Sequence, residues 1–338
     1  MKIGKIPESV LRRSVLRQLK TDRKEVLNGA GIGEDCAIFS FSDSPIVSCM
    51  QEAVVKGETD AAAEGQETEP HVTMAHLIQR CVNNLAAAGA QPVAVMITLL
   101  LPQTFEEPEL KAFMGEAEEI CGKLSVSIAG GQTRVSGEIK APVAVVTGFG
   151  ELSCTSKAAA PGQDVIVSKW IGLEGTALLA RRYREGLLSR YPAHLVDEAI
   201  RFDRYLSVLP EAIAAVRAGV CAMHDASVGG IFTALWELAE KAGVGLAIDM
   251  RKLPLRQETV EVCEYCNVNP YELLSGGSLV MTAEDGPGLV AALKERQIPA
   301  VIVGKVTDSN DRLLLNGDEV RYMDRPKTDE LYRIFQVP

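Results

Sequence analysis

Three glycine-rich segments of this 338-residue chain carry residue types that contact phosphate groups in proteins. They are GAGIGEDCA (29–37), GGQTRV (130–135) and HDASVGGIFTALWELAEKAG (224–243). Glycine permits positive φ and close backbone approach, so such a loop can present N–H groups to an anion. The first segment has neither a GK[ST] ending nor a GxGxxG that opens a helix, and alone it is a weak signal because surface turns often look similar.

The third segment runs from a short loop into an amphipathic helix. Free N–H groups at Gly229 and Gly230, together with the helix dipole, favour an anion at this position. Asp225 is either a functional carboxylate or an N-cap of the helix. His224 is more simply explained as a hydrogen-bonded core histidine than as a ligand, since no metal-binding partner accompanies it.

Two further groups have a functional and a plain structural interpretation. Glu174 lies in GLEGTALLA (172–180), a second glycine-led helix start, where a carboxylate also favours the helix dipole. Cys263 and Cys266 form a CxxC, but no second CxxC or spaced His pair supplies the four ligands that zinc takes. Because this CxxC has helical spacing, core thiols are the favoured interpretation, and the scattered cysteines indicate reduced, cytosolic thiols.

The elements that must position these segments alternate between helix and strand. In the N-terminal half the spacing predicts helices over 7–20, 71–89 and 107–123, and strands over 36–41, 45–49, 92–101, 124–129 and 141–150. A Gly-Gly turn is expected after the strand at 124–129, and a surface loop over the acidic stretch 57–70.

The C-terminal half repeats this alternation after a turn-rich junction at 151–164. Predicted strands cover 165–169, 244–250, 278–283 and 300–306, with a strand or turn at 220–224. Predicted helices cover 175–184, 195–217, 231–242, 256–266 and 287–296. Asn316-Gly317 indicates a hairpin over 313–320. The sequence therefore predicts two mixed α/β domains, 1–152 and 153–338.

The charge and hydropathy of the chain exclude several classes of partner. The net charge is −10 and no long basic run occurs, which argues against nucleic acid or an anionic membrane as a partner. The longest apolar stretch, 92–102, is about half of what a membrane-spanning helix needs. No signal peptide is visible, so we expect a cytoplasmic protein.

In their order along the chain, the motifs resemble the PurM/AIR synthase-related superfamily, and most closely its HypE-like hydrogenase maturation proteins. Thiamine-monophosphate kinase and selenophosphate synthetase are similar as well. The resemblance covers nearly the whole chain and rests on the strings GKIPESVLRRSV, GIGEDCA, VNNLAAAGAQP, LLLP, GGQTRV, PGQDV, GLEGTALLA, SVLPEA, AMHDASVGG and LLSGGSLV. Each string is modest by itself, and their collinearity over about 300 residues makes the resemblance specific.

This resemblance implies an N-terminal α/β domain that shares its sheet in a homodimer, a C-terminal α/β domain, and ATP bound with magnesium. It implies Asp35 as metal ligand, and Asp35 and Asp225 as catalytic residues. The implied nucleotide-binding residues are Gly31, Gly33, Asp35, Asn84, Gly130, Gly131, Gln132, Gly229 and Gly230. Phosphoryl activation of an amide or carbonyl oxygen in hydrogenase maturation would be the activity, and another maturation protein a possible partner.

The chain departs from the family at positions that should hold metal. Met50, Asn84 and Gln132 stand where the resemblance implies carboxylate or imidazole groups, and Gly276 stands where HypE often has Glu. Each lost carboxylate removes attraction to a cation on the order of 4 kcal/mol per unit charge at ~4 Å and an effective dielectric near 20. HypE also ends in a cysteine that carries its substrate group, whereas this chain ends Phe335-Gln336-Val337-Pro338, so self-carried HypE chemistry is not expected.

Three hypotheses follow from the sequence. The first is an ATP-dependent enzyme whose nucleotide site is lined by Asp35, Asn84, Gln132 and Asp225. The second is a non-catalytic paralogue that keeps the dimer and an anion or nucleotide pocket. The third gives the glycines turn-forming roles only. The intact glycine loops favour anion binding, and the missing acids favour weak or absent metal-dependent catalysis.

Overall fold

The computed structural model describes Glu8 and residues 26–28, 32–33, 37–40, 45–57, 70–154 and 157–335. The chain divides into two compact units, which we describe separately. The first unit contains residues 26–28, 37–40, 45–57 and 70–153 of the described chain. The second contains residues from Cys154 onward, together with Ile32 and Gly33 from the first glycine-rich segment. The predicted helix over 7–20, apart from Glu8, and most of the predicted loop over 57–70 lie outside the described residues.

The first unit is built on one twisted sheet. Its strands follow the spatial order β1-β2-β3-β6-β4-β5, and only the β4–β5 pair is parallel. The strands are β1 (Val26–Asn28), β2 (Ala37–Ser40), β3 (Pro45–Val54), β4 (Ala90–Leu101), β5 (Ser127–Val135) and β6 (Val143–Leu152).

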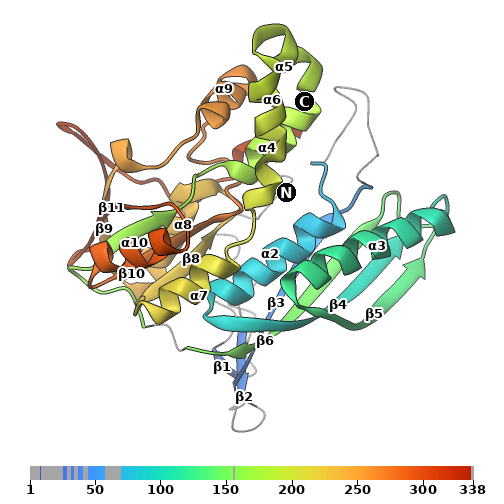
Figure 1. Cartoon of the computed structure of the whole chain (residues 1–338), viewed down its shortest axis with the longest axis horizontal. Coiled ribbons are helices and arrows are strands. Elements are labelled where there is room, and N and C mark those ends of the chain that lie inside the picture. Colours follow the sequence, from blue (N-terminus) through green and yellow to red (C-terminus); the bar gives the residue numbers. More distant parts are fainter. Residues whose placement is uncertain are drawn as a thin grey trace. The chain divides into compact units, whose positions relative to one another are not determined.

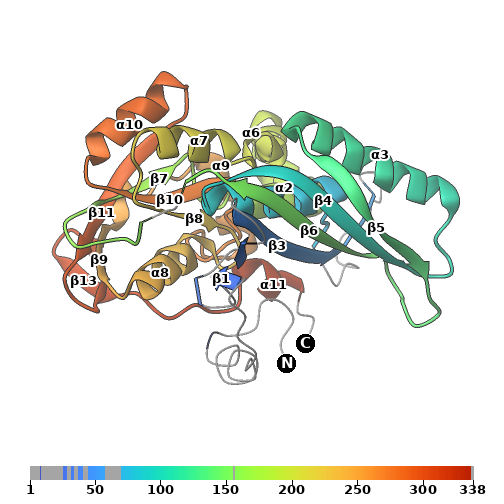
Figure 2. The same cartoon turned by 90° about the horizontal axis from the view of Figure 1, so that it is seen from below.

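Two helices, α2 (Met74–Ala87) and α3 (Glu107–Leu124), lie side by side on one face of this sheet (Figure 1). The start of α2 is fixed where the Thr73 N–H donates to Nδ1 of His76, and its end is fixed by Gly89 at φ 79°. The apolar face of α2 packs on β3, β6 and β4, as the close approach of Cys81 and Leu85 to Gly148 shows. Among the described residues of this first unit, no helix lies on the opposite face of the sheet (Figure 2).

The second unit contains a seven-stranded sheet in the order β13-β12-β9-β11-β7-β10-β8, antiparallel except between β12 and β9. The strands are β7 (Asp164–Ser168), β8 (Ala222–Ala226), β9 (Gly245–Asp249), β10 (Ser278–Ala283), β11 (Ala300–Thr307), β12 (Arg312–Asn316) and β13 (Glu319–Tyr322). β7 and β10 are buried along their whole length, which matches their continuous apolar sequences.

Helices cover both faces of this second sheet. α8 (Gly230–Ala242) lies on one face, and α7 (Leu209–Arg217) and α10 (Gly286–Glu295) lie on the other (Figure 2). A separate helical layer contains α4 (Leu173–Arg182), α5 (Arg184–Arg190), α6 (Ala193–Ile200) and α9 (Gln257–Cys266), with the short α11 (Glu330–Phe335) packed against it. Two 3-10 turns complete the unit, η3 (Arg201–Tyr205) and η4 (Met250–Lys252).

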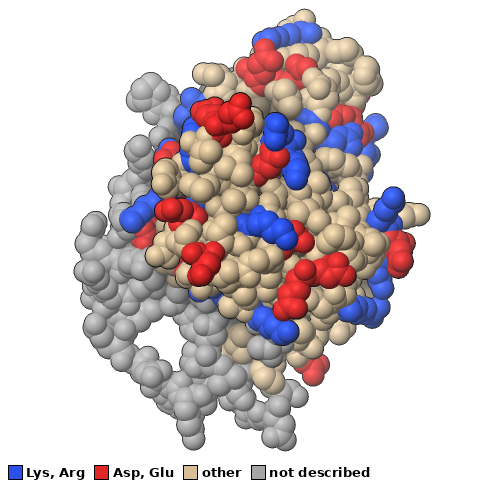
Figure 3. Space-filling view, turned by 90° about the vertical axis from the view of Figure 1, so that its left-hand side faces the viewer, with Lys and Arg blue, Asp and Glu red and all other residues tan. Residues whose placement is uncertain are grey.

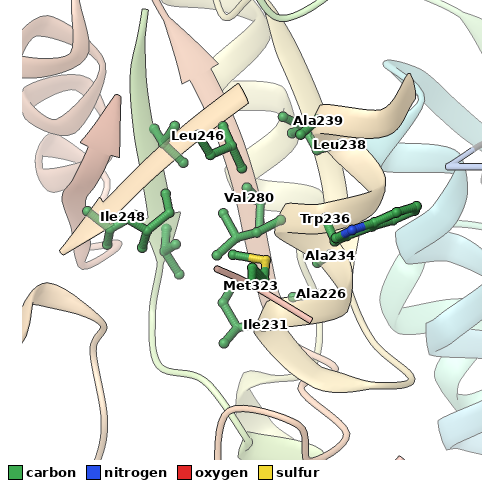
Figure 4. Packing of buried hydrophobic residues seen from close by; sticks show 14 of the residues in the cluster. Ala226, Ile231, Ala234, Trp236, Leu238, Ala239, Leu246, Ile248, Val280 and Met323 are labelled. Atoms are coloured by element: carbon green, nitrogen blue, oxygen red, sulfur yellow. The ribbon is translucent and has the colours of Figure 1, made fainter. Parts of the chain in front are cut away.

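The core of the second unit lies between α8 and the sheet. Ile231 and Leu238 lie on the side of α8 that faces strand residues such as Leu246 and Val280, whereas the Trp236 ring points away from the sheet (Figure 4). These positions follow the helical and strand periods of the sequence, so apolar burial fixes which face of α8 meets the sheet. The mixed α/β class and two-sheet architecture predicted from sequence are confirmed.

Two predicted elements are wrong in detail. The helix predicted over 195–217 is three pieces, α6, η3 and α7, because Pro210 lacks the N–H that a continuous helix would need and instead opens α7. The Gly-Gly turn predicted after 124–129 is not a turn. Gly130 and Gly131 lie inside β5, which pairs with β4 through Val135. The predicted 313–320 hairpin is confirmed, with Gly317 at φ 63°.

On the face of the molecule shown in Figure 3, Lys and Arg side chains alternate with Asp and Glu, without a broad area of one sign. Among the described residues, no helix has the length and apolar character that crossing a membrane requires.

Candidate functional site

The glycine pair before α8 adopts the backbone conformation that the sequence predicted. Gly229 (φ 84°) and Gly230 (φ 70°) are both left-handed. A Cβ at Gly229 would lie 2.3 Å from Oγ1 of Thr233, and one at Gly230 would lie 2.4 Å from the carbonyl oxygen of Tyr271. Any side chain at either position would therefore collide with its neighbours, and glycine is required by the fold itself.

The N–H groups of this pair already have acceptors inside the unit. The Gly229 N–H donates to Oδ2 of Asp329 at 2.5 Å, and the Gly230 N–H donates to the carbonyl oxygen of Ser227 at 3.1 Å. An anion that contacts Gly229 must therefore compete with a buried carboxylate of the chain. The prediction that Gly229 and Gly230 bind a phosphate stays a prediction, with this competitor added.

Asp329 is a structural residue that the sequence analysis missed. It is 1% exposed and accepts hydrogen bonds from three backbone N–H groups, those of Gly229, Leu274 (3.2 Å) and Leu331 (2.8 Å). It thereby connects the loop before α8, the loop before β10 and the start of α11. The local signal was available, because an Asp just before a helix is a common N-cap, but its contact with Gly229 spans 100 residues.

Asp225 lies at the end of β8, where it pairs in register with Leu279 of β10, and it is buried. The N-cap of α8 is Gly229, so the interpretation of Asp225 as the cap is wrong. His224 makes a 3.1 Å hydrogen bond with Glu237 of α8, which confirms the interpretation as a hydrogen-bonded core histidine.

A buried ion pair lies near Asp225. The Lys169 ammonium contacts Oε1 of Glu211 at 2.5 Å and donates to the carbonyl oxygens of Tyr205 (2.7 Å) and Ser207 (2.6 Å). Burial lowers the pKa of Lys169, while the charges of Glu211 and Asp225 oppose that shift. Asp225 is therefore part of a buried charged group at the ends of β7 and β8.

Glu174 occupies space that a side chain at position 276 would need. The Glu174 side chain is buried in the first turn of α4, and a Cβ at Gly276 would lie 2.0 Å from its Oε2. The glycine that stands where HypE often has Glu therefore makes room for another carboxylate, one that comes from α4. The local sequence around Glu174 shows a helix start and gives no sign of this contact with position 276.

In the first unit, two of the three positions that depart from the family lie on the open face of the sheet. Met50 of β3 is 62% exposed and lies in one register row with Thr147, Met96 and Gly130. Gln132 lies two rows further along the sheet, beside Thr98. Three strand spacings of about 4.8 Å separate β3 from β5, so these two positions are at least about 14 Å apart. They cannot share a metal ion within one chain.

Asn84 belongs to the other side of the sheet. It lies on α2, which packs on the helix-covered face, and its side chain is buried. Within the first unit, Asn84 is therefore not brought next to Met50 or Gln132. Gly131 approaches β4 so closely that a Cβ would lie 1.8 Å from the carbonyl oxygen of Ile97, which gives this glycine a packing role in addition to any ligand contact.

The first glycine-rich segment is described only in part. Gly31 and Asp35 lie outside the described residues. Gly33 (φ 75°) lies against α8, where its Cβ would be 2.6 Å from the carbonyl oxygen of Glu237. Glu237 is seven residues beyond Gly230, about 10 Å along the helix at 1.5 Å per residue, so Gly33 and the glycine pair contact different turns of α8.

No metal centre is evident in the described part of the chain. Its His, Cys, Asp and Glu residues form no group of three that could hold a metal ion. Cys263 and Cys266 lie on α9 against an apolar core, and burial raises the pKa of Cys266 to about 12. The core-thiol interpretation of this CxxC is therefore supported.

Two known family models match this chain. The N-terminal domain model described as "AIR synthase related protein" matches residues 33–152, and the corresponding C-terminal domain model matches residues 160–315. The chain belongs to the AIR synthase-related family. This confirms the resemblance inferred from the motifs.

Curated relatives of this AIR synthase-related protein include proteins named for hydrogenase formation. A putative hydrogenase expression/formation protein of Methanocaldococcus jannaschii is 26% identical. The alignment covers 98% of this chain and 97% of that protein. The carbamoyl dehydratase HypE of Rhodobacter capsulatus is 30% identical over 66% of each chain. The chain thus spans nearly all of the first relative and about two thirds of the second.

A solved structure of the maturation protein HypE in complex with ATP shares the fold. Its TM-score is 0.69 over 96% of both chains, at 18% sequence identity. This likeness establishes the PurM-like two-domain fold of the chain.

Proposed function

We propose that this AIR synthase-related protein binds a nucleotide, ATP in the first instance, as a cytoplasmic homodimer that acts in hydrogenase maturation or related metabolism. The observation that carries the proposal is the match of both family domains across residues 33–152 and 160–315. The hydrogenase-related names of its relatives and the ATP complex of a HypE with the same fold support it. Phosphoryl activation of an amide or carbonyl oxygen, with Asp35 and Asp225 as catalytic residues and another maturation protein as partner, belongs to the same proposal.

The magnesium that the family implies does not fit the described residues. Met50 offers no hard ligand, Asn84 and Gln132 offer neutral oxygens only, and Met50 and Gln132 lie three strands apart. This observation favours a second candidate, a non-catalytic paralogue that binds nucleotide without magnesium. Both candidates share the nucleotide and differ only in its dependence on metal.

Titration of ATP with and without magnesium separates the two candidates. We expect ATP to stabilise the protein by RT ln(1 + [L]/Kd), about 2.7 kcal/mol at a hundredfold excess over Kd. Calorimetry and thermal unfolding measure this, with EDTA replacing magnesium in the matched sample. Equal stabilisation in both samples supports the paralogue, and stabilisation only with magnesium supports the enzyme. No stabilisation at millimolar ATP in either sample would refute nucleotide binding.

The open face of the first sheet supports the proposed homodimer. Large apolar side chains on this face remain exposed to water, among them Ile46, Met50, Val93 and Met96. An antiparallel sheet normally presents polar residues on its solvent face, and a contiguous apolar patch marks a protein interface. A second copy of the chain, with the same apolar face, is the partner that this surface fits.

Met96→Glu is expected to dissociate the dimer. Met96 is 43% exposed, so the charge is tolerated in the monomer, but each dimer would bury two carboxylates without partners. We expect the dimer dissociation constant to rise at least about a hundredfold, equivalent to about 2.7 kcal/mol. Sedimentation velocity checks this. Val260→Glu on α9, where Val260 is 39% exposed, is the matched control and should leave the mass unchanged.

A further inference from the structure

The second unit contains a cavity of about 280 Å³. Of the predicted nucleotide-binding residues that the structure describes, Gly229 is the one that lines it. The cavity lining comes from the start of α8, from the loop 269–272 and from the end of β13 and the segment that follows it, up to Thr328, together with Met250 of η4 and Leu314 of β12. Gly229, Thr233 and Leu314 are buried. We propose that this cavity binds a small planar aromatic anion, with its ring against the aromatic wall and its phosphate or carboxylate at the basic rim.

The aromatic wall of the cavity is rigid. The rings of Phe232 and Tyr271 stack with centroids 5.1 Å apart and an interplanar angle of 10°. The Phe232 N–H donates to the carbonyl oxygen of Tyr271, and the Tyr271 N–H donates to Oδ1 of Asn269. Since Asp329 also holds Gly229 and Leu274, the wall is organised before any ligand arrives, which reduces the entropy lost on binding.

The ring chemistry of the site matches a planar ligand. Stacked aromatic side chains offer a flat apolar surface, and offset stacking adds favourable energy beyond area burial. Met250 extends this surface with a polarizable thioether. A cavity of this volume lies at the small end of ligand pockets, which suits a one- or two-ring molecule and excludes a whole nucleoside triphosphate.

The rim supplies three cationic side chains, Arg321, Arg325 and Lys327. Arg321 contacts Glu319 at 3.3 Å, and Lys327 contacts Asp324 at 2.6 Å, both as exposed pairs. Exposed ion pairs contribute little to stability. Arg321 and Lys327 can therefore release a carboxylate of the chain and bind an anionic group of a ligand at small cost. Glu272 also lines the cavity, and burial raises the pKa of its carboxyl group.

The probe for this site is 1-naphthyl phosphate, titrated by calorimetry into the full chain. We expect one saturable site per chain, and dissociation constants at least about tenfold weaker for 1-naphthol and for inorganic phosphate, because each keeps only half of the contacts. Tyr271→Leu should raise the dissociation constant of naphthyl phosphate about five- to tenfold. Tyr271→Phe keeps the ring and should bind naphthyl phosphate as tightly as the unchanged protein does.

The charged rim is tested in parallel with a matched surface variant. Arg321→Ala combined with Lys327→Ala should weaken the binding of naphthyl phosphate but not that of naphthol. Lys294→Ala on α10 should leave both affinities unchanged. The proposal is wrong if Tyr271→Leu and Tyr271→Phe bind naphthyl phosphate with equal affinity. It is also wrong if naphthyl phosphate does not bind at millimolar concentration. Because Gly229 is also a predicted nucleotide contact, stabilisation by ATP is measured separately on each variant, so that failure of this site and failure of nucleotide binding are distinguished. A thermal unfolding scan of each variant confirms that it is folded.

Discussion

Asp329→Ala is expected to lower the free energy of unfolding by about 3 to 5 kcal/mol. The change removes the acceptor of three backbone N–H groups, on Gly229, Leu274 and Leu331, and each buried donor left without an acceptor costs about 1 to 3 kcal/mol. Urea unfolding followed by circular dichroism measures the loss. Asp329→Asn should be intermediate, since it keeps one carbonyl acceptor.

Asp324 provides the control for this variant. It lies five residues earlier in the same segment, but its side chain is 71% exposed and contacts Lys327 only as a surface pair. Asp324→Ala should therefore leave the urea midpoint nearly unchanged. If the Asp324 and Asp329 variants lose the same stability, the assignment of Asp329 as a three-way connection is wrong.

Glu211→Ala is expected to cost about 3 to 5 kcal/mol, because it removes the carboxylate that contacts the buried Lys169 ammonium. The remaining acceptors of Lys169, the carbonyl oxygens of Tyr205 and Ser207, are neutral and do not replace the carboxylate. The loss should be larger at pH 7 than at pH 10, because the unpaired lysine, whose pKa burial already lowers, can then shed its proton. Chemical unfolding at both pH values tests this.

Two further variants bracket that result. The double variant Lys169→Met, Glu211→Leu should recover most of the loss, since replacing both members of a buried pair by apolar groups is often neutral. Glu119→Ala breaks an exposed pair with Lys123 on α3 and should give no measurable change. A Glu211→Ala variant as stable as Glu119→Ala would contradict the burial of the Lys169–Glu211 pair.

The sequence predicts the class of the fold well because apolar spacing is a local property. The helices at α2, α8 and α10 and the strands at β7, β10 and β11 all lie where the periodicity of their own residues places them. The predicted helix over 195–217 failed where Pro210 forced a new start. Gly130 and Gly131 were misassigned to a turn, because only the approach to Ile97 of β4 shows why a strand needs glycine there.

The candidate site was predicted less completely than the fold. The glycine pair at 229–230 was found because its conformation depends on neighbours in sequence. The contact of Asp329 with Gly229, and of Glu174 with Gly276, joins residues about a hundred positions apart, and no local pattern reports such contacts. The separation of Met50 from Gln132 likewise depends on strand order, which the spacing of residues within each strand does not determine.

The hydrogen bond between Gly229 and Asp329 also has a consequence for synthesis of the chain on the ribosome. The loop before α8 emerges 100 residues ahead of the carboxylate that completes it, a delay of about 5 to 20 s at ordinary translation rates. During that interval the Gly229 N–H has no Asp329 to bind, and water or a cellular anion can contact it. The second unit therefore cannot reach its final packing until its last helix has left the ribosome.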